Sequence, residues 1–162
     1  MDKLDIVKSK IIGPDKLHYN LAQWKFKGEI IVFTNGCFDI LHRGHIEYLS
    51  GAAGYGDILV IGLNTDESVR KIKGKGRPYQ DEYSRALMLA SLHFVTAVIL
   101  FGEETPYELI KIIQPDILVK GSDYKHEEIV GRDIVEARGG KVITIDYIKG
   151  YSSTDIIKKV NP

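Results

Sequence analysis

Residues 30–45 read IIVFTNGCFDILHRGH, a strand-like run followed by a turn and the start of an amphipathic segment. The first four residues are β-branched or aromatic, which is the composition of a buried strand. The Asn-Gly pair at 35–36 predicts the end of that strand, and apolar residues recur at helical spacing after Arg43. The stretch therefore predicts a strand-to-helix unit of an α/β fold, with a polar turn between the two elements.

This polar turn has the composition of an anion-binding site. His42 and His45 lie at the predicted helix start, where unpaired N–H groups and the positive end of the helix dipole favour a phosphate. Gly44 between them leaves no side chain to block close approach of a ligand to the backbone. In an open parallel sheet the turn also lies at the carboxyl edge of a strand, where such folds bind ligands. We therefore expect a phosphate-containing ligand here.

The rest of the chain alternates strand-like and helix-like segments. Apolar runs predict strands at 57–64, 95–101, 116–120 and 141–145, and periodicity or capping signals predict helices at 14–27, 80–92, 105–113, 129–137 and 153–160. The helix at 105–113 is expected to begin with a capping box formed by Thr105 and Glu108. The expected fold is a single Rossmann-like, doubly wound α/β domain over residues 1–162, with five parallel strands and helices on both faces. Residues 1–28 are expected to form a helical extension packed on this domain.

The composition of the chain indicates which binding partners and which cellular compartment to expect. The 162 residues suit one domain with a sizeable core. Lys+Arg and Asp+Glu number 22 each, so bulk charge predicts neither a nucleic-acid nor a membrane partner. The apolar runs are of strand length, and the N-terminus lacks the apolar core of a secretory signal. With Cys37 as the single cysteine and no internal disulfide, we expect a cytoplasmic protein.

Three predicted loops, at 34–45, 64–77 and 121–125, follow strands and therefore fall on the same edge of the sheet. The second half of the 64–77 segment, which ends in KGKGRP, is predicted to be a mobile surface loop. The Ser-Ser-Thr run at 152–154 opens the last predicted helix with hydroxyl and N–H groups that suit an anion. A site built from these segments holds imidazoles, lysines and arginines, which fits a polyphosphate.

The segment GCFDILHRGH resembles the signature of the cytidylyltransferase-like nucleotidyltransferases, which carry G-x-F-D followed by H-x-G-H. The closer similarity is to the adenylyltransferase domain of the bacterial bifunctional heptose-phosphate kinase/adenylyltransferases. It extends through FTNGCFDILHRGHIEYL, GDILVIGLNTDESV, KGKGRP, ETP, PDILVKGSDY and SSTDIIKK, and so covers roughly residues 30–160. No sugar-kinase domain is present, so the chain resembles a stand-alone adenylyltransferase half.

The resemblance implies transfer of AMP from ATP to D-glycero-D-manno-heptose 1-phosphate, giving ADP-heptose for lipopolysaccharide synthesis and pyrophosphate. The attacking phosphate oxygen is already an anion, so catalysis of this kind depends on positioning and electrostatics. The implied catalytic residues are His42, His45 and Lys73. Mg²⁺ is expected to accompany ATP, held by phosphates and water without ligands from the protein.

The resemblance also implies binding roles for further residues. The expected nucleotide-binding residues are Cys37, Phe38, Gly44, Gly121, Asp123, Tyr124, Ser153 and Thr154. The expected substrate-binding residues are Asn35, Asp39, Lys71 and Arg85, although Asp39 could instead orient its own loop and Arg85 could be structural. A homodimer is a further expectation from the family.

Several of these features have plainer explanations. The paired histidines could bind a metal, but no third ligand lies nearby and the glycine between them favours phosphate. Cys37 could be a nucleophile, but no local signature supports one, and a small buried side chain is the simpler interpretation. The basic residues at 71–77 could form a solvated loop. The Glu103–Glu104 pair is expected to serve the dipole of the following helix rather than acid–base chemistry.

Two other functional hypotheses remain open from the sequence. The same chemistry could act on other substrates, as in a glycerol-3-phosphate or ethanolamine-phosphate cytidylyltransferase or an FMN adenylyltransferase. Alternatively, the chain could be a nucleotide-binding regulatory module without turnover, although the histidines and Lys73 are intact. The TNGCFD and VKGSDY segments favour the heptose reaction.

Overall fold

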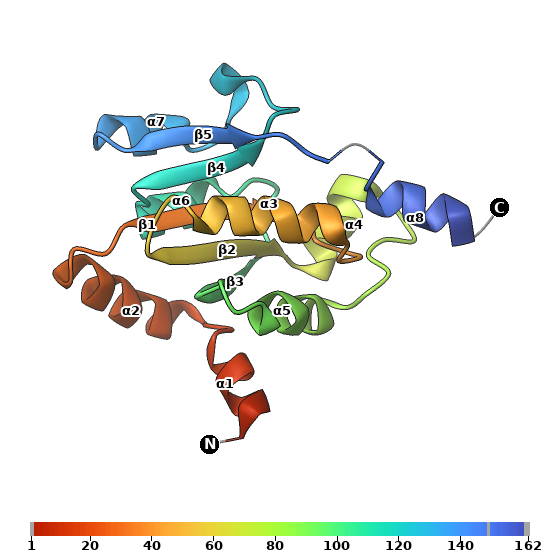
Figure 1. The fold of residues 1–162 in the computed structure, drawn as a ribbon, viewed down its shortest axis with the longest axis horizontal. Coiled ribbons are helices and arrows are strands. Elements are labelled where there is room, and N and C mark those ends of the chain that lie inside the picture. The colour runs from red at the N-terminus through yellow and green to blue at the C-terminus, as the bar shows by residue number, and fades with distance from the viewer. Residues whose placement is uncertain (1, 149, 161–162) are drawn as a thin grey trace.

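The computed structural model describes residues 2–148 and 150–160 and contains a five-stranded parallel sheet (Figure 1). The strands are β1 (Ile31–Gly36), β2 (Ile58–Asn64), β3 (Ala97–Phe101), β4 (Ile117–Gly121) and β5 (Lys141–Ile145), in the order β3-β2-β1-β4-β5. The helices are α1 (Lys3–Ser9), α2 (Pro14–Phe26), α3 (Arg43–Ala53), α4 (Asp66–Lys73), α5 (Glu82–Ser91), α6 (Tyr107–Ile113), α7 (Arg132–Ala137) and α8 (Ser153–Val160). The predicted doubly wound α/β fold is confirmed.

Each face of the sheet carries its own apolar cluster because side chains alternate along the strands. In β1, Ile31 and Phe33 pack with residues of α2, α6 and α7. Val32, between them, belongs to the opposite cluster with residues of α3 and α5. Helices therefore cover both faces and leave the carboxyl ends of the strands for the loops and for α8 (Figure 1).

The N-terminal segment packs on this sheet at two places. In α2, Leu17, Leu21 and Trp24 are buried in the cluster shared with α6 and α7. Ile11 forms an isolated parallel bridge with Val98, so the chain between α1 and α2 covers the edge of β3. Met1 of the predicted extension lies outside the described residues. Within residues 2–148 and 150–160, no helix has the length and apolar character needed to cross a bilayer.

Two predicted boundaries near the site are wrong. The first strand does not end before the Asn-Gly pair, because Asn35 and Gly36 continue in register with Gly62 and Leu63 of β2. Parallel pairing outweighs the local preference of these residues for a turn. The charged segment after β2 is helical as far as Lys73, since Thr65 caps α4 by accepting a hydrogen bond from the Ser68 N–H.

Two later helices also differ from the prediction. The N-cap of α6 is Pro106, without a side-chain cap, so the capping box expected at Thr105 does not form. Helix α7 begins at Arg132 rather than Ile129, because a 3-10 turn at His126–Glu128 and the left-handed Gly131 precede it. The apolar periodicity of this stretch does not distinguish a helix from a turn that also buries Ile129.

Strands β1 and β4 separate near their carboxyl ends. Their pairing consists of Val32 with Ile117 and Phe33 with Leu118, although both strands continue beyond these residues. The Tyr48 hydroxyl bridges the two strands there: it lies 2.8 Å from the Thr34 hydroxyl and donates to the β4 backbone. The strand order reverses direction between β1 and β4, so the separation lies at the switch point where open α/β sheets bind ligands.

Candidate active site

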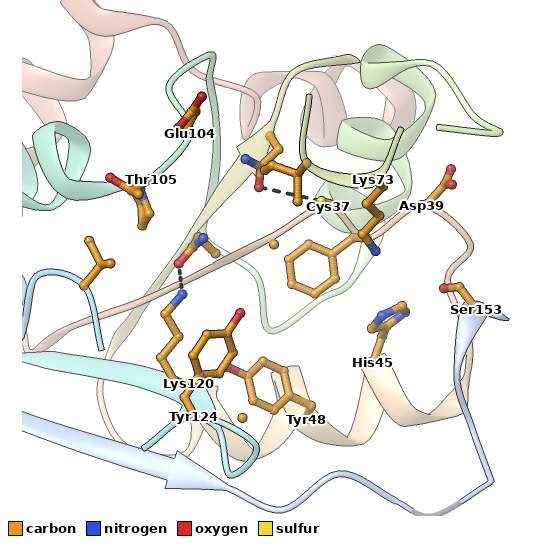
Figure 2. A pocket seen from close by; sticks show the side chains of 18 of the residues that line it. Cys37, Asp39, His45, Tyr48, Lys73, Glu104, Thr105, Lys120, Tyr124 and Ser153 are labelled. Carbon is orange, nitrogen blue, oxygen red and sulfur yellow. Dashed lines mark hydrogen bonds between the residues drawn. The ribbon is translucent and has the colours of Figure 1, made fainter. Parts of the chain in front are cut away.

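A cavity of about 430 Å³ opens at this switch point (Figure 2). Its wall comes from the ends of β1, β2 and β4, from α3 and α4, and from the segments that precede α6 and α8. The predicted site residues that line it are Asn35, Cys37, Phe38, Asp39, His45, Lys73, Gly121, Tyr124 and Ser153. The predicted site residues that do not line it are His42, Gly44, Lys71, Arg85, Asp123 and Thr154.

The two histidines form one stacked pair at the start of α3. His42 is the N-cap residue and makes no side-chain cap, and His45 lies in the first turn. Their ring centroids are 3.8 Å apart with an interplanar angle of 21°. The edge of Phe38 packs on His45 at 5.3 Å. This packing fixes the orientation of His45 toward the cavity, and His42, which does not line the cavity, stacks on its ring.

The pKa values of both imidazoles are lowered, which favours the neutral form. Burial lowers the pKa of His42. Burial, together with the nearby His42 and the positive Lys73, lowers the pKa of His45 to about 4. A neutral imidazole still donates one hydrogen bond. The pair therefore suits phosphate oxygens as a set of donors, while the positive charge at this end comes from Lys73.

Phe38 has a strained backbone that determines its place in the wall. Its φ of 43° lies in the left-handed region, which is uncommon for an aromatic residue. A Cβ at Gly36 would lie 2.9 Å from the Phe38 ring, so glycine is required there for close packing. Gly44 has a similar packing role, because a Cβ there would lie 3.0 Å from the His42 ring. The nucleotide contact at Gly44 stays a prediction.

The two lysines predicted near the end of α4 have different surroundings. Lys73, the last residue of the helix, lines the cavity on the same side as His45 (Figure 2). Lys71 is exposed and pairs with Glu67 at 2.8 Å one helical turn earlier. The structure therefore brings Lys73 into the site and places Lys71 on a solvated face, which corrects the prediction for Lys71.

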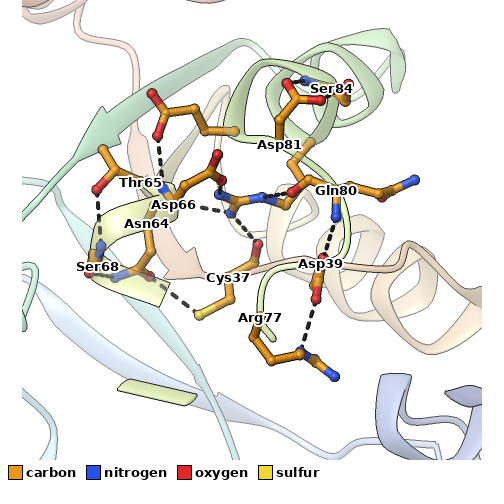
Figure 3. Close-up of polar contacts among 12 residues, drawn as sticks. Cys37, Asp39, Asn64, Thr65, Asp66, Ser68, Arg77, Gln80, Asp81 and Ser84 are labelled. Atoms are coloured by element: carbon orange, nitrogen blue, oxygen red, sulfur yellow. Dashed lines mark hydrogen bonds and ion pairs between the residues drawn. The ribbon is translucent and has the colours of Figure 1, made fainter. Parts of the chain in front are cut away.

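Arg85 is fully buried and is engaged by the protein itself. Its guanidinium donates to the carbonyl oxygens of Cys37 and Asn64 at 2.7 and 2.8 Å. It also donates to the Gln80 carbonyl and forms an ion pair with Asp66 at 2.7 Å (Figure 3). Arg85 joins the ends of β1 and β2 behind the cavity. The prediction that it binds substrate is therefore replaced by a structural role.

Asp39 lines the cavity but its carboxylate is occupied by the chain. It accepts hydrogen bonds from the backbone N–H groups of Tyr79 and Gln80 at 2.8 and 3.1 Å. It also pairs with Arg77 at 3.0 Å (Figure 3). These contacts anchor the end of the KGKGRP loop beside the turn after β1. Of the two roles predicted for Asp39, the structure shows the one in which it orients the loop.

Cys37 faces both the network and the cavity. Its thiol donates to the Asn64 side-chain oxygen at 3.9 Å, and its carbonyl accepts from Arg85. Burial raises the pKa of the Cys37 thiol, which opposes the thiolate that a nucleophile would require. The geometry therefore favours the predicted role of a small side chain in the wall.

The segments after β4 and before α8 close the cavity. Gly121 and Tyr124 line it, whereas Asp123 is exposed outside it. A Cβ at Gly121 would collide with the Tyr147 ring, so this aromatic residue lies directly on the glycine backbone. Ser153 at the start of α8 donates to the Ile40 carbonyl at 3.4 Å and lines the cavity, whereas Thr154 is exposed.

Several residues of the cavity wall were not predicted from the sequence. Lys120, Tyr48 and Tyr147 line the cavity, as do Asn64, Ile72, Glu104, Thr105, Pro106, Glu128 and Val130. A lysine at the end of the otherwise apolar run DILVK was the available signal for Lys120. Glu104 lines the cavity without Glu103, so the two adjacent carboxylates do not converge as an acid–base pair. Among residues 2–148 and 150–160, no group of three or more His, Cys, Asp or Glu side chains is placed to hold a metal ion.

Comparison with known proteins agrees with this geometry. A family model described as cytidylyltransferase-like matches residues 33–159. Two proteins named "Bifunctional protein HldE", from Rhodopseudomonas palustris and Citrifermentans bemidjiense, are 50% and 52% identical over 94% of this chain. The chain spans 31% of the length of each of these relatives.

Two solved structures share the fold. The lipopolysaccharide core biosynthesis protein from Thermoplasma volcanium is 33% identical, with a TM-score of 0.63 over 77% of this chain and 100% of that chain. A pantoate-β-alanine ligase from Francisella tularensis has the same TM-score of 0.63 at 16% identity, over 94% of this chain and 77% of that chain.

The doubly wound fold places the histidine pair at the switch point, where open α/β sheets bind ligands. The cytidylyltransferase-like family model matches most of the chain, so the chain belongs to this family. Its resemblance to the adenylyltransferase part of the bifunctional heptose proteins is confirmed by the identity with the HldE relatives.

Proposed function

We propose that this protein transfers AMP from ATP to D-glycero-D-manno-heptose 1-phosphate, releasing pyrophosphate and forming ADP-heptose. The observation that carries the proposal is the stacked His42–His45 pair at the start of α3, in which His45 lines a cavity shared with Lys73 and Ser153. These groups supply hydrogen-bond donors and a positive charge where a triphosphate would lie.

The chemistry that these residues support is phosphoryl-type transfer without a general base. An oxygen of the sugar phosphate attacks the α-phosphorus of ATP, and the bond from that phosphorus to the pyrophosphate oxygen breaks. The attacking oxygen carries no proton to remove at neutral pH, so the neutral histidines act as donors to developing charge. Their stacking keeps them in place, which lowers the reorganisation needed in the transition state.

Magnesium fits this arrangement as a partner of ATP rather than of the protein. The residues on the cavity wall offer donors and cations to phosphates, and the described residues contribute no cluster of metal ligands. We propose that Mg²⁺ is held by phosphate oxygens and water, and that it neutralises charge on the triphosphate when bound.

The choice of heptose 1-phosphate as acceptor depends on the similarity of the TNGCFD and VKGSDY segments to the heptose enzymes, and it is supported by the HldE relatives. The name of the Thermoplasma volcanium protein links that relative to lipopolysaccharide core biosynthesis. We propose the same product class here and a reaction in the cytoplasm, where ATP is supplied.

The test is pyrophosphate release by purified protein with Mg²⁺ and a crossed panel of substrates. ATP or CTP is paired with heptose 1-phosphate, glycerol 3-phosphate, ethanolamine phosphate or FMN, with His42→Ala as the inactive control. Turnover with ATP and heptose 1-phosphate alone supports the proposal. Turnover with CTP, or with FMN as acceptor, contradicts it. Thermal stabilisation by ATP without any pyrophosphate release would indicate a regulatory module.

A further inference from the structure

Arg77 is the last basic residue of the KGKGRP loop, and it is held beside the turn that follows β1 (Figure 3). Its Nε lies 3.0 Å from the carboxylate of Asp39, whose side chain is fully buried. Its guanidinium carbon lies 5.1 Å from the centre of the Tyr79 ring. Because the Arg77 side chain is only 16% exposed, its guanidinium is held between a carboxylate and an aromatic ring.

The fold does not use the hydrogen-bond donors of Arg77. Among residues 2–148 and 150–160, Asp39 is its single ion-pair partner, and the buried Nε–H has no aligned acceptor. Arg85, by contrast, directs its N–H groups at three carbonyl oxygens and at Asp66. A guanidinium has five N–H donors in a planar fork that matches the oxygens of a phosphate. Arg77 therefore keeps donors for an anionic ligand.

Arg77 lies beside the histidine end of the cavity. Asp39, which holds it, lines the cavity on the same side as Lys73 and Ser153 (Figure 2). The residue after Asp39, Ile40, accepts a hydrogen bond from the Ser153 hydroxyl at the start of α8. The turn that carries Asp39 is therefore in contact with the segment that closes this end of the cavity.

Two cations of the same loop act on this end. Lys73 lines the cavity, and Arg77 follows it four residues later. Burial raises the pKa of the Cys37 thiol in the cavity wall, while the charge of Lys73 and, more weakly, that of Arg77 lower it. The field of both cations therefore reaches the wall. The Asp39 carboxylate opposes this field little, because two backbone N–H groups and Arg77 already engage it.

The leaving pyrophosphate needs such a cation. As the acceptor oxygen bonds to the α-phosphorus, the bond from that phosphorus to the bridging oxygen breaks and its electron pair stays on the β-phosphate. Burial lowers the pKa of His42 and of His45, so the imidazoles supply donors rather than charge. We infer that Arg77, held by Asp39 and Tyr79, donates to the β- and γ-phosphate oxygens of ATP and stabilises the leaving pyrophosphate. This inference rests on the proposed function for its reaction, whereas the contact itself requires only the bound phosphates.

Calorimetric titration tests this contact without an acceptor. Arg77→Met removes the guanidinium, and Arg70→Met is the matched control because it removes an exposed guanidinium from α4. With Mg²⁺ present, we expect Arg77→Met to weaken the binding of inorganic pyrophosphate and of ATP by about 10- to 100-fold, the usual effect of losing hydrogen bonds to a charged group. AMP lacks the β- and γ-phosphates, so its Kd should stay within about twofold of wild type in both variants.

The AMP titration also shows whether Arg77→Met is folded. Unchanged pyrophosphate binding in this variant would overturn the inference, as would an equal loss of AMP and pyrophosphate binding. The same loss in Arg70→Met would indicate an effect of bulk charge and would also overturn it. No pyrophosphate binding by the wild type would contradict the contact directly.

Steady-state kinetics separate this inference from the proposed function. If the wild type shows no turnover with any acceptor, the proposed function fails, and the titrations still decide the contact of Arg77. If the wild type turns over, kcat of Arg77→Met should fall by about 10- to 1000-fold, because the leaving group loses a fixed cation. The KM for heptose 1-phosphate should stay within about twofold. A kcat equal to that of the wild type, or a rise confined to the acceptor KM, would overturn the inference.

Discussion

Arg85 and Lys120 are both buried cations near the carboxyl ends of the strands, yet their surroundings differ completely. They are the two buried basic side chains among the described residues. Arg85 donates to three carbonyl oxygens and pairs with Asp66, whereas Lys120 donates to one amide and faces the cavity. The difference shows that burial of a charge does not identify a binding residue. The number of hydrogen-bond donors that the protein itself occupies distinguishes a structural cation from one that can bind a ligand.

The comparison predicts that Arg85→Met will cause the largest loss of stability. It leaves the Cys37 and Asn64 carbonyls without this donor and Asp66 without its partner. We expect the free energy of unfolding to fall by about 3–5 kcal/mol, measured by chemical denaturation. Arg70→Met, an exposed change on α4, should alter it by less than about 0.5 kcal/mol. Equal free energies of unfolding for Arg85→Met and Arg70→Met would contradict the structural role of Arg85.

His45→Ala should affect turnover strongly and stability weakly. The imidazole faces the cavity and packs on His42 and Phe38, so its removal deletes a donor to developing charge. We expect kcat to fall by about 100- to 1000-fold, as for other preorganised donors. Steady-state pyrophosphate release measures this loss, with His93→Ala as the control outside the cavity wall. A fall of less than about tenfold in His45→Ala would argue against its catalytic role.

The pH dependence of substrate binding should distinguish Lys120 from an arginine at the same place. Burial lowers the pKa of Lys120 to about 8, while the charge of Asp123 acts in the opposite direction. Above that pH the amine loses its charge, so the KM for ATP, an anion that would occupy the cavity lined by Lys120, should rise between about pH 7 and about pH 9. Lys120→Arg, which stays protonated, should remove this rise. An identical pH profile for the two proteins would contradict the prediction.

Lys120→Met should have the smallest effect on stability. The change removes a buried charge without an ion-pair partner and keeps most of the side-chain volume. We expect the free energy of unfolding to change by less than about 1 kcal/mol, or to increase. Denaturation of this variant beside Arg85→Met makes the comparison direct. A loss as large as that in Arg85→Met would show that Lys120 is structural.

The sequence predicted the parts of the molecule that local patterns determine. The order of strands and helices follows from apolar periodicity, and the place of His42 and His45 follows from a strand, a turn and a helix that are adjacent in the chain. The family match confirms the resemblance that was carried by GCFDILHRGH.

The remaining features depend on contacts between distant segments. Lys120 is buried because β4 lies beside β1, and Arg85 is structural because its carbonyl partners come from the turn after β1, the end of β2 and the segment before α5. Tyr147 packs on Gly121 from a different strand connection. Apart from Gln80, these partners are distant in sequence, so residue type and spacing alone do not distinguish a cation that supports the fold from one that faces a ligand.

A competition experiment analysed by mass spectrometry tests the proposed activity and its substrates most directly. Wild-type protein and Mg²⁺ are mixed with equal concentrations of ATP and CTP and of heptose 1-phosphate, glycerol 3-phosphate and FMN, and the nucleotide products are identified. We expect ADP-heptose as the dominant product, with an equal amount of pyrophosphate. A CDP-linked product or FAD as the main species would contradict the proposed substrates, and no nucleotide product at all would contradict the proposed activity.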